Sequence, residues 1–279
     1  MNPKAMKHKI FETAFLVNWA RASDPVLSRD PWANLWVTPE SIRFSENFRD
    51  KISPHEEFQL CLRNRFFTEA LEYFEKKWGH FVFLNIASGF TSYPFILNPT
   101  NTFIEMDQPH VIEYRQQKLT QFEKNNQIPK RKIHFISTDL NSKEGLEKLE
   151  RTLKQNSSQP MFVLLEGITY YLKEDINLKI FNLFEKILHP KSQVGLITWA
   201  SAVKETPIMQ KILDCFEKDL LFPRDQYTWI DDGWFSQWEH LKPLKRADYL
   251  ELEKNYCPKP WRLTRNEIVD ETFYLLEKI

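Results

Sequence analysis

Glycine is scarce in this chain, with six among 279 residues. Each one is therefore expected to mark a backbone position that other residues fill poorly, such as a turn or a close approach to a ligand. Cysteine is scarce too, and Cys61, Cys215 and Cys257 are far apart and odd in number. This pattern argues against a disulfide framework and against a CxxC metal site. We expect no bound metal and a reducing, cytoplasmic setting.

The chain also lacks any surplus of charge, since 38 basic residues balance 38 acidic ones. Without a basic excess to contact phosphates, nucleic acid is not an expected partner. No run of about 18 apolar residues is present, so no membrane span is expected. The N-terminal segment lacks the apolar centre of a signal peptide. With 42% hydrophobic residues, the composition is that of a globular protein able to bury a large core.

Short apolar runs of strand length alternate with longer amphipathic stretches. The predicted strands are 81–86, 102–106, 133–136, 161–165, 194–199 and 271–276. The predicted helices are 10–23, 55–78, 109–125, 142–156 and 173–188. Repeated βαβ units with right-handed crossovers predict an α/β fold with a doubly wound, mostly parallel sheet.

We expect a single domain over 1–279 that has four segments. These are a helical N-terminal lead-in (1–80), a cofactor-binding core (81–199), an aromatic-rich helical insertion or lid (200–245) and closing strands (246–279). No flexible linker flanks the insertion, which argues against a separate domain.

Ligands of such sheets bind beyond the carboxyl ends of the strands. The first strand runs into "NIASGFTS", where Gly89 can take a positive φ. Glu105 and Asp107 follow on the second strand, and Asp107 lies 18 positions after Gly89. A carboxylate at that distance suits a ribose diol. The alternatives are a plain turn at Gly89 and a solvated strand end for one of the two acids.

The third and fourth strands end in "STDL" and "LLEGITYYL". Asp139 can accept a hydrogen bond from an adenine amino group while Leu140 packs on the ring, or it can instead cap the next helix. Glu166 directly follows a buried run. A carboxylate there is costly without a partner, such as a cationic ligand.

These strand ends, as an ordered set, resemble the class I S-adenosylmethionine-dependent methyltransferases, and in particular the leucine carboxyl methyltransferase family with its bacterial O-methyltransferase relatives. The segments that carry the resemblance are "ASGFTSY", "EMDQP", "DL" and "EGITYYL", with "TAFLVNWARASDPVLSRDPWA" and "LRNRFF" upstream and "WRLTRNE" and "FYLLE" near the end. The resemblance implies a Rossmann-like, seven-stranded sheet and S-adenosyl-L-methionine as the cofactor.

Carried over residue by residue, the resemblance implies that the helix residue Arg63 pairs with the methionine carboxylate. It further implies a cofactor site made by Ala87, Ser88, Gly89, Asp107, Gln108, Asp139, Leu140 and Glu166. In this set Asp107 holds the ribose, Asp139 and Leu140 bracket the adenine, and Glu166 lies near the methionine. Without the resemblance, an ion pair on a helix surface is an equally good interpretation of Arg63.

The loop departs from the family's pattern at two positions. Thr91 and Tyr93 stand where the family has an aspartate and an arginine, and Gly89 is the single glycine of the loop. The loss of charge keeps a second function open, that of a catalytically impaired relative which binds or regulates. A third possible function is that of a nicotinamide-dependent oxidoreductase. Such enzymes also use the loop after the first strand and the acid at the end of the second, but that loop usually contains more glycines.

The expected acceptor is an oxygen of a small molecule or peptide, most simply a carboxylate. A carboxylate is already ionised near neutral pH, so its methylation needs no general base. A hydroxyl acceptor would need one, and Tyr171 is the candidate catalytic residue beside His80, His110 and His134. Arg21 and Arg224 are the guessed ligands of an acidic substrate. The aromatic residues of the insertion would either complete a core or line an apolar acceptor pocket.

Overall fold

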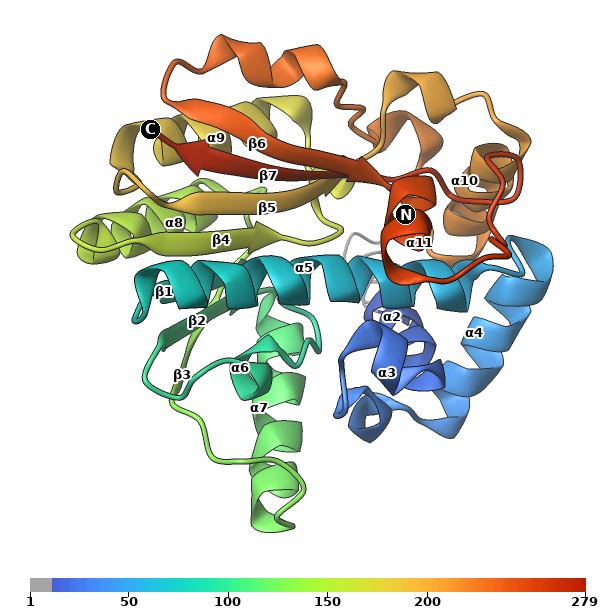
Figure 1. Cartoon of the computed structure of the whole chain (residues 1–279), viewed down its shortest axis with the longest axis horizontal. Coiled ribbons are helices and arrows are strands. Elements are labelled where there is room, and N and C mark those ends of the chain that lie inside the picture. Colours follow the sequence, from blue (N-terminus) through green and yellow to red (C-terminus); the bar gives the residue numbers. More distant parts are fainter. Residues whose placement is uncertain (1–11) are drawn as a thin grey trace.

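Seven strands form one sheet in the computed structural model, which describes residues 12–279 (Figure 1). Their order is β3-β2-β1-β4-β5-β7-β6. The strands are β1 (Val82–Ile86), β2 (Thr102–Asp107), β3 (Ile133–Ser137), β4 (Met161–Leu165), β5 (Gln193–Thr198), β6 (Leu241–Asp248) and β7 (Thr272–Lys278). The first five are parallel, and β7 runs antiparallel to both β5 and β6. The doubly wound, mostly parallel sheet predicted from the sequence is confirmed.

Helices connect the strands as the periodicity predicts. Their bounds are α2 (Glu12–Ser23), α3 (Pro25–Ser28), α4 (Pro39–Lys51), α5 (Glu56–Trp78), α6 (Tyr93–Ile96), α7 (Pro109–Lys124), α8 (Lys143–Asn156), α9 (Glu174–Ile187), α10 (Pro207–Asp219) and α11 (Tyr249–Tyr256). The helix predicted over 10–23 begins at Glu12 in the structure, and its first two positions lie outside the described residues. Charged residues mark both ends of α5. Glu56 and Glu57 lie in its first turn and Lys76 and Lys77 in its last, which favours the helix dipole at both ends.

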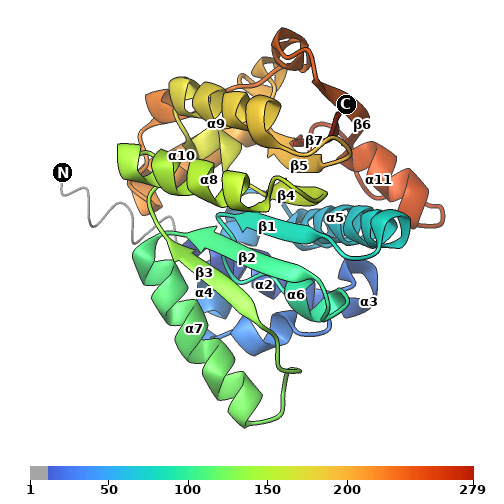
Figure 2. The same ribbon diagram turned by 90° about the vertical axis from the view of Figure 1, so that its left-hand side faces the viewer.

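Successive side chains along a strand point to opposite faces of the sheet, and each face packs into its own apolar core. On one face, Phe83, Phe162 and Leu164 pack against α5 and the lead-in helices. On the other face, Leu84 and Val163 pack against α8 and α9. Figure 2 shows α8 and α9 together on the side of the sheet away from α5. The lead-in therefore forms a layer on the sheet, and α2 contacts both α4 and α5.

The segment after β5 differs from the prediction in two ways. The insertion (200–245) was expected to be helical, but its main helix is α10, and the 3-10 turns 224–226 and 232–237 follow it. In addition, β6 begins at Leu241, so the end of the predicted insertion (200–245) belongs to the sheet. The strand was missed because it is an edge strand with Lys242, Pro243 and Lys245 and shows no apolar alternation. Charges and proline are usual on edges, since they discourage pairing with another chain.

The aromatic residues of the insertion join both cores instead of one. Phe216, Phe222 and Tyr227 pack in the core on the α5 face. Phe235 and Trp238 pack against Phe181 of α9 on the other face. The insertion thus wraps around the end of the sheet.

A buried ion pair ties β2 to α7. Both Glu105 and Arg115 are fully buried, and the guanidinium donates to both carboxylate oxygens. Nη2 of Arg115 also donates to the carbonyl oxygen of Thr91 at 2.7 Å, which fixes the loop after β1. Neither acid of β2 is therefore a solvated strand end, because Glu105 is structural and Asp107 lines the cavity described below.

We predict that Glu105→Gln lowers the free energy of unfolding by about 3–5 kcal/mol, because the Arg115 charge stays buried without its carboxylate. Urea unfolding followed by circular dichroism measures the loss. Lys179→Met, which breaks an exposed pair with Asp175 on α9, should leave the transition unchanged. A small loss in the Glu105 variant, comparable to that of the control, would contradict this role.

Candidate functional site

The loop after β1 turns sharply toward the end of β2. Ala87 and Gly89 both have positive φ, 54° and 50°. Glycine tolerates this conformation without cost, whereas alanine is strained by about 1–2 kcal/mol. The N–H of Gly89 donates to Oδ2 of Asp107 at 2.8 Å, and the N–H of Gln108 donates to Oδ1 at 2.6 Å. The turn therefore orients the carboxylate of Asp107.

The carboxylate of Asp107 has an unusual pKa for its type. Burial raises the pKa to about 6, although the two backbone N–H groups act in the opposite direction. Near neutral pH the group is mostly ionised. A polar ligand that donates two hydrogen bonds to it would favour the ionised form further.

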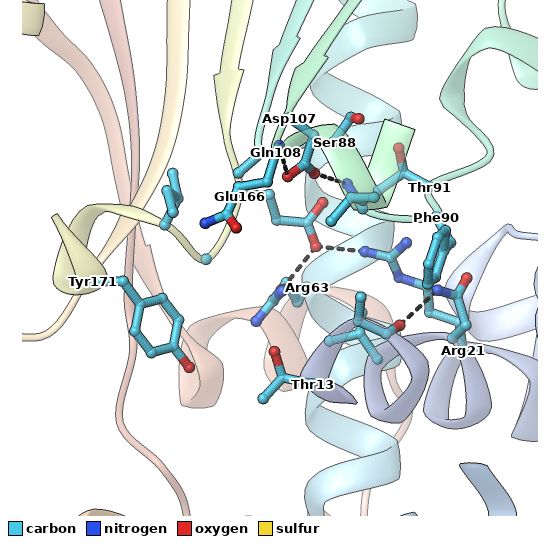
Figure 3. A pocket seen from close by; sticks show the side chains of 18 of the residues that line it. Thr13, Arg21, Arg63, Ser88, Phe90, Thr91, Asp107, Gln108, Glu166 and Tyr171 are labelled. Carbon is cyan, nitrogen blue, oxygen red and sulfur yellow. Dashed lines mark hydrogen bonds and ion pairs between the residues drawn. The ribbon is translucent and has the colours of Figure 1, made fainter. Parts of the chain in front are cut away.

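Beyond the end of β4, Glu166 lies between two arginines (Figure 3). Nη2 of Arg21 is 2.6 Å from Oε1, and Nε of Arg63 is 2.8 Å from the same oxygen. The hydroxyl of Tyr93 donates to Oε2 at 2.7 Å. Burial alone would raise the pKa of Glu166, but the two arginines and the hydroxyl lower it to about 2. The sequence led us to expect a cationic ligand as the partner of Glu166, but two arginines of the protein itself take that place.

Gly167 allows Arg63 to come close to the backbone. Its φ is +73°, and a Cβ there would lie 3.0 Å from Nη2 of Arg63 and 3.2 Å from the hydroxyl of Tyr170. A larger residue would displace the guanidinium. Nη1 of Arg63 lies 3.5 Å from Oε2 of Glu271, so Arg63 links two carboxylates.

Three adjoining cavities follow the carboxyl ends of the strands. The middle cavity contains Asp107, Glu166, Arg21 and Arg63. A smaller cavity on one side shares the following residues with it: Ala87, Asp107, Gln108 and Ile168. On the other side lies an inner cavity. The residues that line both it and the middle cavity are Thr13, Val17, Arg63, Gly167 and Tyr171. The side cavity is completed by Asp139 and Leu140, so the strand-end residues predicted from the sequence come together in one row.

The sequence model of the leucine carboxyl methyltransferase family matches residues 11–185, which is well over half of the chain. The chain belongs to the leucine carboxyl methyltransferase family. It is a methyltransferase by family and fold, and S-adenosyl-L-methionine is its cofactor. No curated protein matches the sequence.

Two solved structures share the fold. A presumed methyltransferase from Thermobifida fusca is 13% identical, with a TM-score of 0.63 over 87% of this chain and 89% of that one. A DUF574 family protein from Streptomyces avermitilis is 11% identical, with a TM-score of 0.65 over 96% of this chain and 97% of that one. At this identity they support the seven-stranded methyltransferase architecture alone.

The unsatisfied atoms of the middle cavity fit this family's cofactor. Nε and Nη1 of Arg21 are buried and make no hydrogen bond among residues 12–279, although Nη1 lies 4.0 Å from Oδ2 of the buried Asp30 in an ion pair. A carboxylate such as that of the methionine moiety would satisfy them. The ionised Asp107 can accept hydrogen bonds from vicinal hydroxyls. The cofactor supplies the methyl group, and these are the residues that would hold and orient it.

The other predicted residues are placed as follows. Tyr171 lies between the middle and inner cavities, and burial raises its pKa well above the ordinary value. A tyrosine with such a pKa is a hydrogen-bond donor and a poor base. His110 lines the middle cavity, whereas His80 and His134 are exposed.

Three further expectations concern Ser88, Asp139 and Arg224. Ser88 lines the middle cavity. Asp139 does not cap α8, because Ser142 does, and its Oδ1 accepts from the N–H of Asn141 in a turn. Arg224 is not brought near Arg21. Its guanidinium contacts Gln210, Asp214 and Glu217, and it lines none of the three cavities.

Sequence reasoning missed several residues of the site. Thr13 and Val17 line the cavities eight and four positions before Arg21, on one face of α2. That spacing was a readable helical signal. Glu56 and Glu271, which line the inner cavity, had no local signal, since their meeting depends on the tertiary fold.

Two negative findings apply to the part of the chain that the structure describes. No helix within residues 12–279 is long and apolar enough to cross a membrane. In the same residues no group of three or more His, Cys, Asp or Glu side chains is placed to hold a metal ion.

The Glu166 cluster makes the protein sensitive to acid. The pKa of Glu166 is lowered from 4.5 to about 2, so the stability it contributes is full above pH 4.5 and is lost as pH falls toward 2. We predict that Glu166→Gln costs on the order of 3 kcal/mol at pH 7.

Urea unfolding of both proteins at pH 7, 4 and 3 tests this prediction. The difference between wild type and variant should shrink steadily as the pH falls, because the protonated glutamate then resembles glutamine. A difference that is constant with pH would contradict the assigned pKa.

Proposed function

We propose that the protein transfers a methyl group from S-adenosylmethionine to an oxygen atom of a small molecule or a peptide. The observation that carries this proposal is the row of three cavities, in which each part of the cofactor has a chemically suitable neighbour. In this arrangement Asp139 and Leu140 bracket the adenine, and Asp107 holds the ribose. Arg63 and Arg21 pair with the methionine carboxylate, and the inner cavity receives the acceptor.

The reaction is an in-line displacement at the methyl carbon. Positioning of the acceptor oxygen, methyl carbon and sulfur can supply about 7–11 kcal/mol of the barrier. The chain's contribution is to fix the methionine end, which the Glu166 cluster does by holding both arginines in place. Tyr171 remains a candidate catalytic residue, as a donor that orients the acceptor and not as a base.

The alternative of a catalytically impaired binding protein arose from Thr91 and Tyr93. In the structure both side chains have structural partners. Oγ1 of Thr91 accepts from Nδ2 of Asn85 at 2.8 Å, and its carbonyl accepts from Arg115. The hydroxyl of Tyr93 binds Glu166, and Arg21 of α2 supplies the positive charge beside it. This compensation supports turnover and disfavours the alternative.

The acceptor oxygen belongs to one of two chemical classes. A carboxylate, which the sequence favours, needs no base but does need a cation to bind it. A hydroxyl needs no cation but does need a group that takes its proton. The charges that line the inner cavity bear on the choice between the two classes.

Calorimetric titration with S-adenosylhomocysteine tests the proposal. We predict binding to the wild type and an affinity at least several-fold lower for Asp107→Asn, because the amide accepts poorly from ribose hydroxyls. The affinity of the wild type should fall as the pH drops below about 6, where Asp107 takes up a proton.

The variant should show a flatter dependence on pH between 5 and 7. Lys154→Met on α8 is the control and should bind like the wild type, because Lys154 pairs with Glu150 on the exposed face of the helix and lines none of the three cavities. Absence of binding to the folded wild-type protein would refute the proposed function.

A further inference from the structure

The inner cavity is rich in carboxyl groups and poor in cations. Its lining contains Glu56 and Glu271, and Arg63 is its one cation among the described residues. Arg63 already bridges Glu166 and Glu271, at 2.8 Å and 3.5 Å. An acceptor carboxylate placed here would face two acidic groups with no unpaired cation. Like charges brought together in a buried site cost several kcal/mol.

Glu271 is fully engaged within the protein. Its Oε2 accepts from the hydroxyl of Tyr249 at 2.6 Å, and its Oε1 accepts from the hydroxyl of Tyr170 at 3.4 Å. Together with the ion pair to Arg63, these contacts leave it little capacity for a ligand.

Glu56 is different. Its side chain lies on the wall of the cavity, and the residue is 8% exposed. Its Oε2 is buried and has no hydrogen-bond partner among residues 12–279. A buried polar atom without a partner is uncommon and costs free energy. Such an atom on a cavity wall is ready to accept a hydrogen bond from a ligand.

The remainder of the wall is apolar and largely aromatic. It includes Phe48, Trp199 and Phe216 with both Tyr170 and Tyr171. The cavity has a volume of about 70 Å³, several times the roughly 10–15 Å³ that a single water molecule needs. The space suits a single ring or a short chain. Tyr171 borders the middle cavity as well, so a ligand bound here lies next to the proposed methionine end.

We propose that the inner cavity takes a small aromatic acceptor with a hydroxyl group, and that Glu56 accepts the proton of that hydroxyl during methyl transfer. The inference rests on the proposed function, because it names the acceptor class and a catalytic residue for that reaction. It replaces the carboxylate acceptor expected from the sequence with a phenol-like one.

The step balances without any further reactant. The hydroxyl oxygen forms a bond to the methyl carbon, and the bond between that carbon and the sulfonium sulfur breaks, leaving its electron pair on sulfur. The hydroxyl proton passes to Oε2 of the ionised Glu56 and is later released to water. The products are the methyl ether and a neutral thioether.

Several charged and titratable groups surround Glu56. Glu271, before β7, and Arg63, two turns along α5, act on it in opposite directions, and Tyr249 of α11 also lies within its field. Burial, followed by Glu271, raises the pKa of Glu56 to about 8. A carboxylate with a pKa near the working pH is a far better base than an ordinary one.

The first experiment uses 4-methylphenol and 4-methylbenzoate, which share a ring and differ in the acceptor group. Binding to the wild-type protein saturated with S-adenosylhomocysteine is followed by tryptophan fluorescence, since Trp199 lines the cavity. At pH 9, where Glu56 is ionised, we expect the phenol to bind about tenfold or more tightly than the benzoate, because the benzoate then meets like charges at the wall. Tighter binding of the benzoate, or binding of neither compound, would overturn the proposal.

The second experiment measures transfer of a labelled methyl group to 4-methylphenol by the wild type, Glu56→Gln and Glu57→Gln. Glutamine keeps the shape and a hydrogen-bond acceptor but cannot take the proton. We expect the Glu56 variant to bind the phenol but to transfer about 10²–10⁴-fold more slowly. Glu57 pairs with Arg49 at 3.0 Å and does not line the inner cavity, so its variant should transfer at the wild-type rate.

The pH profile separates proton transfer from a merely structural role. In the wild type the rate should rise as the pH increases toward about 8, where Glu56 ionises. The Glu56 variant should lack this rise. An unchanged profile in Glu56→Gln would overturn the proposal. If this variant does not fold, the comparison of phenol with benzoate on the wild type decides alone.

Binding of S-adenosylhomocysteine distinguishes this inference from the proposed function. If the wild type binds it but fails the tests above, the methyltransferase proposal stands and the acceptor assignment falls. If the wild type does not bind it, both fall.

Discussion

The carboxylate of Glu166 between Arg21 and Arg63 is the interaction on which the site depends. It joins α2, α5 and the segment after β4, three elements far apart in the sequence, and Tyr93 adds the start of α6. Each arginine alone would be a costly buried charge, and so would the glutamate. As a cluster they neutralise one another in part. Nε and Nη1 of Arg21 make no hydrogen bond within the described residues, and Nη1 also forms an ion pair with Asp30 at 4.0 Å. The same contacts that anchor the lead-in to the sheet therefore also shape the middle cavity, which is the proposed cofactor site.

A second buried pair, Glu105 with Arg115, stabilises the other side of the site. It holds the loop after β1 through the carbonyl of Thr91, so the loop is fixed by a backbone contact where the family uses charged side chains. Ala87 in this loop has a positive φ, a conformation that glycine adopts more readily than alanine.

The sequence predicted the parallel core and the strand ends well, because buried parallel strands are short apolar runs and their exit loops contain the small and acidic residues. It failed at β6, whose composition is that of a charged edge. It also could not predict which cations would meet Glu166, because Arg21 and Glu166 are 145 positions apart and no local signal marks that contact. Glu56 appeared to be an ordinary first-turn glutamate of α5, and its burial is visible only once α4, α10 and the segment before β7 close around it.

The long chain separation of the Glu166 cluster has a consequence for synthesis. Helix α2 leaves the ribosome about 145 residues before the glutamate that neutralises it. Until β4 is made, Arg21 and Arg63 must stay hydrated, and the apolar face of α5 lacks the strands that cover it. The N-terminal third therefore cannot complete its own packing. The proposed cofactor site is expected to assemble late, when the strands of the sheet pack against helices that were synthesised before them.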